Sequence, residues 1–266
     1  MVRKVFKILQ LVMHIFYGIG IIIFHTHIKR RSAGDPIFKA AFTQWYKQAC
    51  DIVGLKVVVR GEAAEGPVLM VANHISWLDI LLLASVANPR FLSKAEIRKW
   101  PLIGWAGQQI DTLFIKRGER SASEAATAGI MQGLRQDNRI LIFPEGTTTE
   151  GKVVKRLHAR LFGAAINVGS PVQPIVIHYT DGNGVSENTA THTSEHIPFV
   201  GEQNLIYNLW LVLGCENPTA YVHFLPPQDS TGHTRKGLAG EIHQLMQQTL
   251  EQSQEAQMMK IKQLPH

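Results

Sequence analysis

The sequence has little of several features that specialised protein classes need. Its 266 residues include two cysteines, Cys50 and Cys215, which excludes a disulfide-rich secreted scaffold and a zinc cluster built from thiolates. It contains no Walker loop and no G-x-G-x-x-G pattern, so the usual ATP and dinucleotide sites have no support. No repeat or low-complexity segment is present. The length suits one large α/β domain or two small ones.

Charge is also scarce, and it is unevenly distributed. Charged residues make up 18% of the chain against 45% hydrophobic residues, and the formal net charge is +6. Residues 1–35 contain six basic residues and one acidic residue, Asp35, whereas the other 231 residues contain 21 basic and 20 acidic residues. A folded nucleic-acid-binding domain usually carries a basic stripe of its own. The nearly neutral body therefore argues against a nucleic-acid partner.

The basic N-terminal segment encloses a long apolar stretch. Residues 5–24 would form a helix about 30 Å long, which matches the hydrocarbon core of a bilayer. A cleaved signal peptide is the competing interpretation, but histidines and basic residues follow where small residues would be needed. Three basic residues flank each end, so charge does not decide whether the helix spans the bilayer or lies along it. We expect a membrane-associated helix in residues 1–35 and one folded domain in residues 36–266.

The body alternates between strand and helix patterns. Short apolar or β-branched runs predict strands, and apolar residues at helical spacing predict helices. Their alternation predicts an α/β sheet with helices on its faces. Pro174, inside one of the runs, predicts a bulge or an edge strand. The expected strands are residues 55–60, 68–72, 112–116, 139–143, 172–179 and 220–224, and the expected helices are residues 36–53, 76–87, 96–107, 121–136, 157–168, 205–213 and 238–259.

A histidine and an aspartate follow the apolar strand of residues 68–72. Ser76 and Asp79 have the spacing of a capping box, so Asp79 could simply cap the helix that begins here. On a straight helix, His74 and Asp79 would point about 140° apart and could not pair. If His74 lies in the loop and Asp79 in the first turn, the two side chains can meet. An imidazole held by a carboxylate is a general base for reactions near neutral pH.

Two further polar segments follow predicted strands. Glu145 and Gly146 form a Pro-Glu-Gly turn with Thr147 after residues 139–143; this is ordinary turn chemistry, but Gly146 would also let a ligand approach the backbone. Lys116 and Arg117 lie at the end of the strand of residues 112–116, and an arginine there could bind phosphate through two hydrogen bonds. Each segment alone could be a solvated loop.

Together, these segments resemble the motifs of the glycerolipid acyltransferase superfamily, and most closely those of the 1-acylglycerol-3-phosphate (lysophosphatidic acid) acyltransferases. His74 and Asp79 match the family's H-x-x-x-x-D motif, residues 114–117 match F-I-x-R, residues 143–147 match F-P-E-G-T, and residues 172–176 match its proline-containing strand. The resemblance covers about residues 40–225. It implies a mixed sheet, membrane association, and acyl-CoA or acyl-carrier protein as the co-substrate, with no cofactor.

The resemblance has departures that bear on the acceptor. Thr148 stands where the family often has arginine, and Asp111 stands where the second motif usually begins with glycine. His158 occupies a position where lysine is common. Relatives with threonine in place of that arginine include enzymes that acylate other lysolipids, such as lyso-ornithine lipids. We expect lysophosphatidate as the acceptor, with another lysolipid as the alternative.

The expected mechanism makes His74 the general base for the acceptor hydroxyl and Asp79 the residue that orients it. Lys116, Arg117, Glu145, Gly146 and Thr147 are expected to bind substrate. No metal site is expected, because His192 and His196 lie in a polar stretch without a matching acidic pattern.

Two other functional classes remain as alternatives. A thioesterase-like hydrolase would need a nucleophile, and the G-x-S-x-G elbow is absent. A non-catalytic lipid-binding protein could keep the fold without the chemistry. The expected location is a membrane, with the active site on the cytoplasmic side, which would be the inner membrane in a bacterium.

Overall fold

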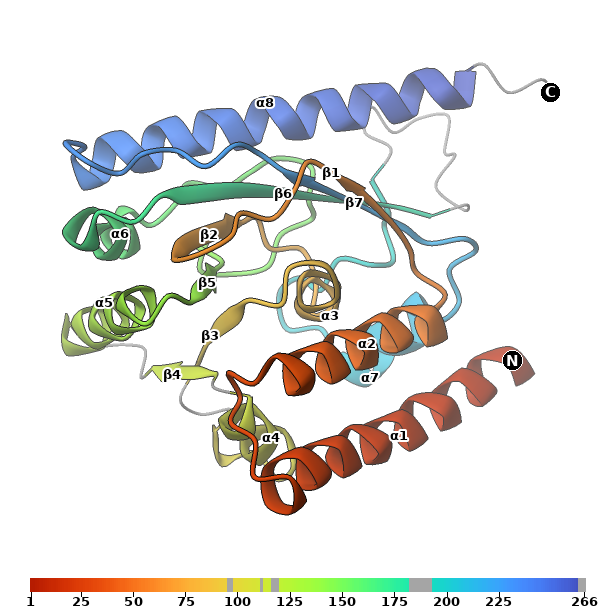
Figure 1. The fold of residues 1–266 in the computed structure, drawn as a ribbon. Helices are drawn as coiled ribbons and strands as arrows, with labels where there is room; N and C mark the ends of the chain where they lie inside the picture. Colours follow the sequence, from red (N-terminus) through yellow and green to blue (C-terminus); the bar gives the residue numbers. More distant parts are fainter. Residues whose placement is uncertain (95–97, 111, 116–119, 182–192, 263–266) are drawn as a thin grey trace.

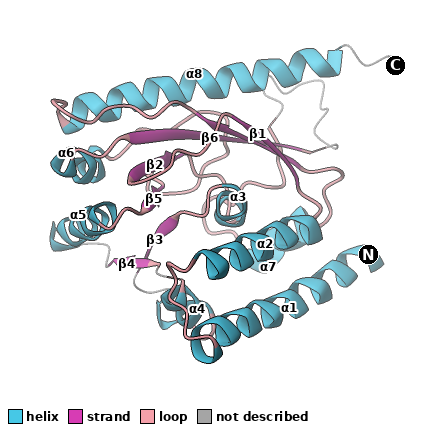
Figure 2. Cartoon of the chain, viewed as in Figure 1, coloured by secondary structure: helices cyan, strands magenta, loops and turns pink. Residues whose placement is uncertain are grey.

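The protein is seen here in a computed structural model, which describes residues 1–94, 98–110, 112–115, 120–181 and 193–262. Figure 1 shows the chain, and Figure 2 shows helices lying on both sides of a central sheet. The strands are β1 (Lys56–Arg60), β2 (Val68–Ala72), β3 (Arg90–Lys94), β4 (Leu113–Ile115), β5 (Arg139–Ile142), β6 (Val172–Thr180) and β7 (Thr219–Phe224). The helices are α1 (Val2–Ile22), the π-helical η1 (Ile23–Ile28), α2 (Pro36–Val53), α3 (Leu78–Val86), α4 (Ile103–Gln109), α5 (Arg120–Arg135), the 3₁₀-helical η3 (Ala159–Phe162), α6 (Gly163–Val168), α7 (Leu205–Val212) and α8 (Arg235–Lys262).

The sheet is mixed and mostly parallel. Its strand order is β1-β7-β6-β2-β5-β3-β4. Among the described strands, β6 and β7 pair in antiparallel fashion and every other neighbouring pair is parallel. The parallel pair β2 and β5 is in register from Val68 opposite Arg139 to Val71 opposite Ile142. The carboxyl ends of β2 and β5 therefore lie at the same edge of the sheet, where the first and third motifs follow them.

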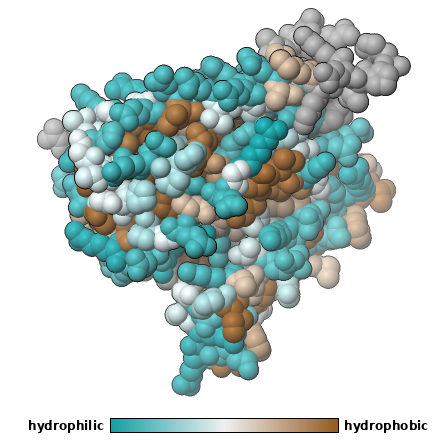
Figure 3. All heavy atoms as spheres, turned by 45° about the horizontal axis from the view of Figure 1, so that its top comes forward, coloured by the Kyte–Doolittle hydropathy of each residue, from teal (hydrophilic) through white to brown (hydrophobic). Residues whose placement is uncertain are grey.

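The two faces of the sheet are buried in separate cores, because side chains alternate along a strand. In β2, Met70 and Ala72 pack with α2, α3 and α7, whereas Leu69 and Val71 pack with α5, α6 and α8. Because both faces of β2 are buried, its sequence is a continuous apolar run rather than an alternation of apolar and polar residues. On the outside, the face that carries α8 is largely hydrophilic, with hydrophobic patches between polar side chains (Figure 3).

Helix α1 packs along α2 through polar and aromatic contacts. Lys7 Nζ donates to the Val53 carbonyl at 2.6 Å. The His14 ring stacks on Trp45 with 4.9 Å between centroids, and Trp45 Nε1 donates to the His14 carbonyl at 2.8 Å. Gly18 permits this approach, since a Cβ there would lie 2.7 Å from the Trp45 ring. The N-terminal helix is thus attached to the folded body by its own side chains.

The opposite side of α1 is exposed and apolar. Residues Val2–Ile28 form one continuous helical stretch of 27 residues that is long and apolar enough to cross a membrane. Within it, an 18-residue segment has a mean hydropathy of 1.9, and 22% of that segment is buried. A water-soluble amphipathic helix buries its apolar face and exposes its polar one, and α1 does the reverse. The large exposed hydrophobic residues of this stretch are Val2, Val5, Phe6, Leu9, Val12, Met13, Ile15, Phe16, Tyr17, Ile23, Phe24 and Ile28.

The expected elements and the observed ones agree except in two places. The pattern of residues 96–107 predicts a helix, whereas the structure has the strand β3 before it and a shorter helix α4 at Ile103–Gln109. The sequence does not predict strand β3, because only two adjacent residues of the five, Phe91 and Leu92, are apolar and they show neither strand alternation nor a continuous apolar run. Residues 157–168 form a 3₁₀ turn followed by α6 rather than one continuous helix.

Of the two alternatives expected for Pro174, the edge strand is wrong and the bulge is confirmed, because the antiparallel pairing shifts by one residue beside it, from Ile175 opposite Phe224 to Val172 opposite Gln228. Pro174 is inside β6, which lies between β7 and β2 in the middle of the sheet. Leu225, the residue after β7, lies opposite Pro174. Proline has no N–H, so it cannot donate the hydrogen bond that the Leu225 carbonyl would accept from any other residue at this position. Instead, Gln173 Nε2 donates to that carbonyl at 3.0 Å, while the Leu225 N–H donates to the Pro174 carbonyl at 3.0 Å. A neighbouring side chain thus replaces the missing backbone donor.

Candidate functional site

The loop after β2 is fixed to β6 before the first motif begins. Asn73 is 1% exposed, and its side chain bonds the backbone of Ile177 in both directions, with Nδ2 donating to the carbonyl at 2.9 Å and Oδ1 accepting from the N–H at 2.7 Å. The amide side chain therefore continues the strand pairing past the end of β2. This places the next residue, His74, at a defined position at the carboxyl edge of the sheet.

His74 and Asp79 form a hydrogen-bonded pair. His74 lies in the loop and Asp79 in the first turn of α3, and Nδ1 of His74 is 2.7 Å from Oδ2 of Asp79. Asp79 is fully buried, whereas the His74 side chain is 21% exposed. The same Oδ2 accepts the backbone N–H groups of Ile75 at 2.7 Å and Ser76 at 3.0 Å. The carboxylate thus accepts backbone N–H groups before α3 and also holds the imidazole. Asp79 can therefore cap the helix and orient His74 at the same time.

Tyr179 is part of this network, and the sequence analysis missed it. Its hydroxyl donates to Oδ1 of Asp79 at 2.8 Å from β6, one hundred residues along the chain. Burial and the adjacent Asp79 carboxylate raise the pKa of Tyr179 well above its ordinary value, so the phenol stays protonated and donates. With both oxygens of Asp79 accepting hydrogen bonds, His74 must carry its proton on Nδ1. Its Nε2 is then free of a proton and able to accept one.

The Pro-Glu-Gly turn lies beside this pair. His74 stacks on Phe143, the last residue before the turn, with 4.0 Å between ring centroids. The Thr149 N–H donates to the His74 carbonyl at 2.8 Å, which ties the end of the turn to the first motif. Gly146 and Thr147 are exposed, and Gly146 has φ = +76°, a conformation that other residues rarely adopt. The structure brings these residues together, and their contact with substrate stays a prediction.

Glu145 is under the turn rather than on its surface. It is 5% exposed, and neither carboxyl oxygen has a hydrogen-bond partner of ordinary geometry within the described part of the chain. Burial, with a smaller contribution from the charge of Asp79, raises the pKa of Glu145 to about 8, against the opposing influence of the nearby Lys155 and of the backbone N–H groups of Lys155 and His74. Glu145 is therefore placed to support the turn from within, and a direct contact with substrate has no geometric support here.

We expect Glu145→Gln to change how stability depends on pH. The pKa of Glu145 is raised from 4.5 to about 8 on folding, so the native state binds the proton more tightly than the unfolded chain. The free energy of unfolding should therefore fall as pH rises from about 4.5 to 8, by roughly 2–5 kcal/mol in total. The glutamine variant should lack this loss.

Urea unfolding at pH 5 and pH 8.5 measures the effect. Glu150→Gln is the matched control, because Glu150 is solvent-exposed on the same segment and pairs with Lys152 at the surface. If Glu145→Gln and the wild-type protein lose stability in parallel with rising pH, Glu145 is not the titrating group.

The other positions singled out in the sequence differ in outcome. Lys116 and Arg117 lie outside the described residues, as does His192. The hydroxyl of Thr148 donates to the Phe199 carbonyl, so this side chain is turned into the loop beside it. His158 lies against the turn, since a Cβ on Gly146 would be 3.0 Å from its Nε2. The described surface of the turn therefore presents a histidine where relatives of this type often have lysine.

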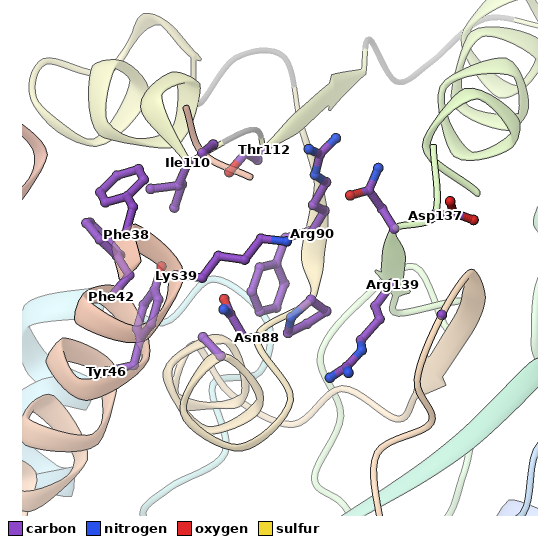
Figure 4. A pocket seen from close by; sticks show the side chains of 16 residues that line it. Phe38, Lys39, Phe42, Tyr46, Asn88, Arg90, Ile110, Thr112, Asp137 and Arg139 are labelled. Carbon is purple, nitrogen blue, oxygen red and sulfur yellow. The ribbon is translucent and has the colours of Figure 1, made fainter. Parts of the chain in front are cut away.

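A cavity of about 220 Å³ lies away from these residues. Figure 4 shows Phe38, Phe42 and Tyr46 of α2 on one side of it and Arg139 on the other. Arg139 is the first residue of β5, whereas Glu145 follows the last residue of the same strand. The cavity is thus at the opposite edge of the sheet from the His74–Asp79 pair, and it is not part of the candidate site.

The chain is similar to known lipid acyltransferases over most of its length. The family model described as Acyltransferase matches residues 52–178, which include both members of the His74–Asp79 pair. The chain is 36% identical over 235 residues to the lyso-ornithine lipid O-acyltransferase of Pseudomonas aeruginosa, covering 88% of each protein. It is 31% identical over 178 residues to the 1-acyl-sn-glycerol-3-phosphate acyltransferase of Neisseria gonorrhoeae, covering 67% of each.

The fold is that of a solved acyltransferase. The crystal structure of the 1-acyl-sn-glycerophosphate acyltransferase PlsC from Thermotoga maritima superposes with a TM-score of 0.70 at 22% identity, covering 94% of each chain. This agreement confirms the expected α/β fold with a mixed, mostly parallel sheet. The two sequence relatives and the matching family model together confirm the resemblance drawn from the motifs, and the chain belongs to the acyltransferase family.

Proposed function

We propose that this acyltransferase moves a fatty acyl group from a thioester to the free hydroxyl of a lysolipid. The observation that carries the proposal is the His74–Asp79 pair, with Nδ1 of His74 held at 2.7 Å by a buried carboxylate. That contact fixes the tautomer and leaves Nε2 at the partly exposed edge of the site. A general base in this position is worth about 10²–10⁴ in rate.

The proposed reaction needs no covalent intermediate with the enzyme. Nε2 of His74 takes the proton from the acceptor hydroxyl as its oxygen attacks the thioester carbonyl. The carbon–sulfur bond then breaks, and the imidazolium returns the proton to the leaving thiolate. Asp79 stabilises the charged imidazolium between these steps. The donor is acyl-CoA or acyl-carrier protein, because both present an activated thioester, and we propose that the acyl-transfer step itself needs no cofactor.

For the acceptor, we place a lyso-ornithine lipid before lysophosphatidate. The sequence analysis had the reverse order. The relative that covers 88% of the chain is a lyso-ornithine lipid O-acyltransferase, and the Thr148 side chain offers a hydrogen bond to Phe199 where a phosphate-binding arginine would stand. Lysophosphatidate is the second candidate, because Arg117 is present in the sequence and one arginine can bind a phosphate through two hydrogen bonds.

A panel of lysolipids tests both the acyl-transfer reaction and the choice of acceptor. Purified full-length protein in detergent is given labelled acyl-CoA or acyl-carrier protein with lyso-ornithine lipid, lysophosphatidate or no acceptor, and His74→Ala serves as the inactive control. We expect acylated product and free thiol only when an acceptor is present, with lyso-ornithine lipid used at least tenfold faster. Thiol release without acceptor would indicate a thioesterase instead. Faster use of lysophosphatidate would make it the preferred acceptor and would not contradict acyl transfer with His74 as the base.

We also propose that the chain attaches to the cytoplasmic side of a membrane through α1. One side of α1 is bonded to the body at Lys7 and His14, so the helix lies along the domain, and its other side is apolar and exposed. A helix held in this way suits the interface of one leaflet. Its two basic ends would add attraction to anionic lipid of about 1 kcal/mol per basic residue.

We expect charges on the outer side of α1 to weaken membrane binding. Met13 and Phe16 are 73% and 64% exposed, so Met13→Glu with Phe16→Glu should leave the packing on α2 intact. In flotation with vesicles that contain anionic phospholipid, the double variant should bind at least tenfold less. Gln248→Glu with Gln252→Glu, on the exposed side of α8, adds the same charge elsewhere and should bind as the wild type does. Equal binding by both pairs would rule out α1 as the anchor.

A further inference from the structure

Three potential metal ligands meet beyond the carboxyl end of β6. Asp181 directly follows β6, His196 belongs to the segment after residue 193, and Cys215 follows α7. Their ligand atoms all lie within 4.8 Å of one another. Oδ2 of Asp181 is 3.5 Å from Nδ1 of His196 and 3.8 Å from Sγ of Cys215. None of the three is a motif residue of the acyltransfer site.

Two of the three ligands are buried, and the cluster is incompletely satisfied. The Asp181 side chain is 1% exposed and Cys215 is 2% exposed, whereas the His196 side chain is 44% exposed. Oδ2 of Asp181 accepts a hydrogen bond from Ser194 Oγ. Six buried side-chain atoms have no hydrogen-bond partner in the described part of the protein, and Oδ1 of Asp181 and Nδ1 of His196 are two of them. A third, Oγ1 of Thr193, is on the same segment as His196. A buried polar atom without a hydrogen-bond partner lowers the stability of the folded state, so several of them at one place indicate a ligand-binding site.

The spacing of these atoms is close to that of a tetrahedral zinc site. Zinc binds sulfur at about 2.3 Å and nitrogen or oxygen at about 2.0–2.2 Å, so tetrahedral ligand atoms lie roughly 3.3–3.6 Å apart. The two separations that involve Oδ2 of Asp181, 3.5 Å and 3.8 Å, need shifts of a few tenths of an ångström. The His196 and Cys215 ligand atoms lie within 4.8 Å of each other and would have to approach to close the site. We propose that Asp181, His196 and Cys215 bind one divalent transition-metal ion of the zinc class, with water in the fourth position.

Binding would release one proton. Burial and the neighbouring Asp181 carboxylate raise the pKa of the Cys215 thiol to about 12, so the thiol is protonated without a metal. The ion displaces the Sγ proton to solvent and binds the thiolate. Lys4 and Lys7 lie near Cys215 and favour its thiolate form.

The ion would act by positioning a segment rather than by taking part in acyl transfer. The segment that contains His196 continues to Phe199, whose N–H donates to the Ile75 carbonyl at 2.9 Å and whose carbonyl accepts from Thr148. Asn208 of α7 bonds the Pro198 carbonyl at 3.0 Å and accepts from Trp77 at 2.9 Å. Holding His196 therefore steadies the backbone on which both catalytic loops rest. The inference is independent of which lipid is acylated.

Cobalt binding tests the site without measuring activity. Full-length protein is stripped with a chelator and titrated with Co²⁺, which gives a thiolate-to-cobalt charge-transfer band when a cysteine is a ligand. We expect one Co²⁺ per chain with this band, displacement by Zn²⁺, and a melting temperature that rises with Zn²⁺ concentration.

Variants assign the ligands. Cys215→Ser should abolish the band, whereas Cys50→Ala, which removes the other buried thiol, should keep it. His196→Gln should weaken Co²⁺ binding at least tenfold, and it should fold normally because the His196 side chain is 44% exposed. His233→Gln is the control for binding by an unrelated histidine. Absence of the band in folded wild-type protein, or equal Co²⁺ affinity in wild-type and His196→Gln protein, would overturn the proposal.

Discussion

Replacement of His74 by alanine is expected to lower kcat by about 10²–10⁴, because the reaction loses the base that takes the hydroxyl proton. The fold should survive, since the His74 side chain is partly exposed and its backbone carbonyl, which accepts from Thr149, is kept. KM for the lysolipid should change little, because Nε2 acts on the reacting hydroxyl rather than on the head group. Steady-state acyl transfer from labelled acyl-CoA measures both constants.

The control for this variant is His233→Ala, which changes a histidine that lies away from the site and pairs with Glu241. It should keep wild-type kcat. More than about a tenth of the wild-type turnover in His74→Ala protein would contradict the base role. An unfolded His74→Ala protein by circular dichroism would show instead that His74 is needed for the loop structure.

Asp79→Asn is expected to cost both activity and stability. The amide has one acceptor oxygen where the carboxylate has two, and Asp79 accepts from His74, the Ile75 and Ser76 N–H groups and Tyr179. An amide N–H facing these donors leaves a buried donor without a partner, at about 1–3 kcal/mol. An amide that donates to Nδ1 would also select the wrong imidazole tautomer. We expect kcat to fall by about 10²–10⁴.

Tyr179→Phe separates the two roles of Asp79. It removes one hydrogen bond to Oδ1 and leaves Oδ2 bonded to His74, so we expect a loss of about 1 kcal/mol in stability with kcat within a few-fold of wild type. The comparison of melting temperature with kcat in the two variants is the measurement. If Asp79→Asn lowers the melting temperature but keeps wild-type kcat, Asp79 only caps α3 and the pair has no catalytic role.

The sequence by itself determined most of the local structure. The continuous apolar run of residues 68–72 could only be a strand buried on both faces, and it forms β2. For His74 and Asp79 to pair, the spacing required His74 in a loop and Asp79 in the first turn of a helix, because the two residues cannot pair on a straight helix. The concentration of charge and apolar residues in residues 1–35 marked α1 as different from the body. Each of these inferences depends on residues within a few positions of one another, where periodicity and turn chemistry act directly.

Tertiary structure alone decided how distant residues complete the site. Tyr179 reaches Asp79 from β6, and Gln173 repairs the pairing that Pro174 interrupts, because the sheet order places β6 between β2 and β7. No local sequence pattern predicts either contact.

The sequence also did not predict which polar side chains are buried. Glu145 reads as a turn residue, yet the structure places its carboxyl group in the interior, where desolvation raises its pKa to about 8. Asp181, His196 and Cys215 are spread over 35 positions, and only the packing of β6 against α7 and the loop before it brings their ligand atoms within 4.8 Å. Desolvation and long-range proximity depend on the folded chain as a whole, and a linear pattern does not encode them.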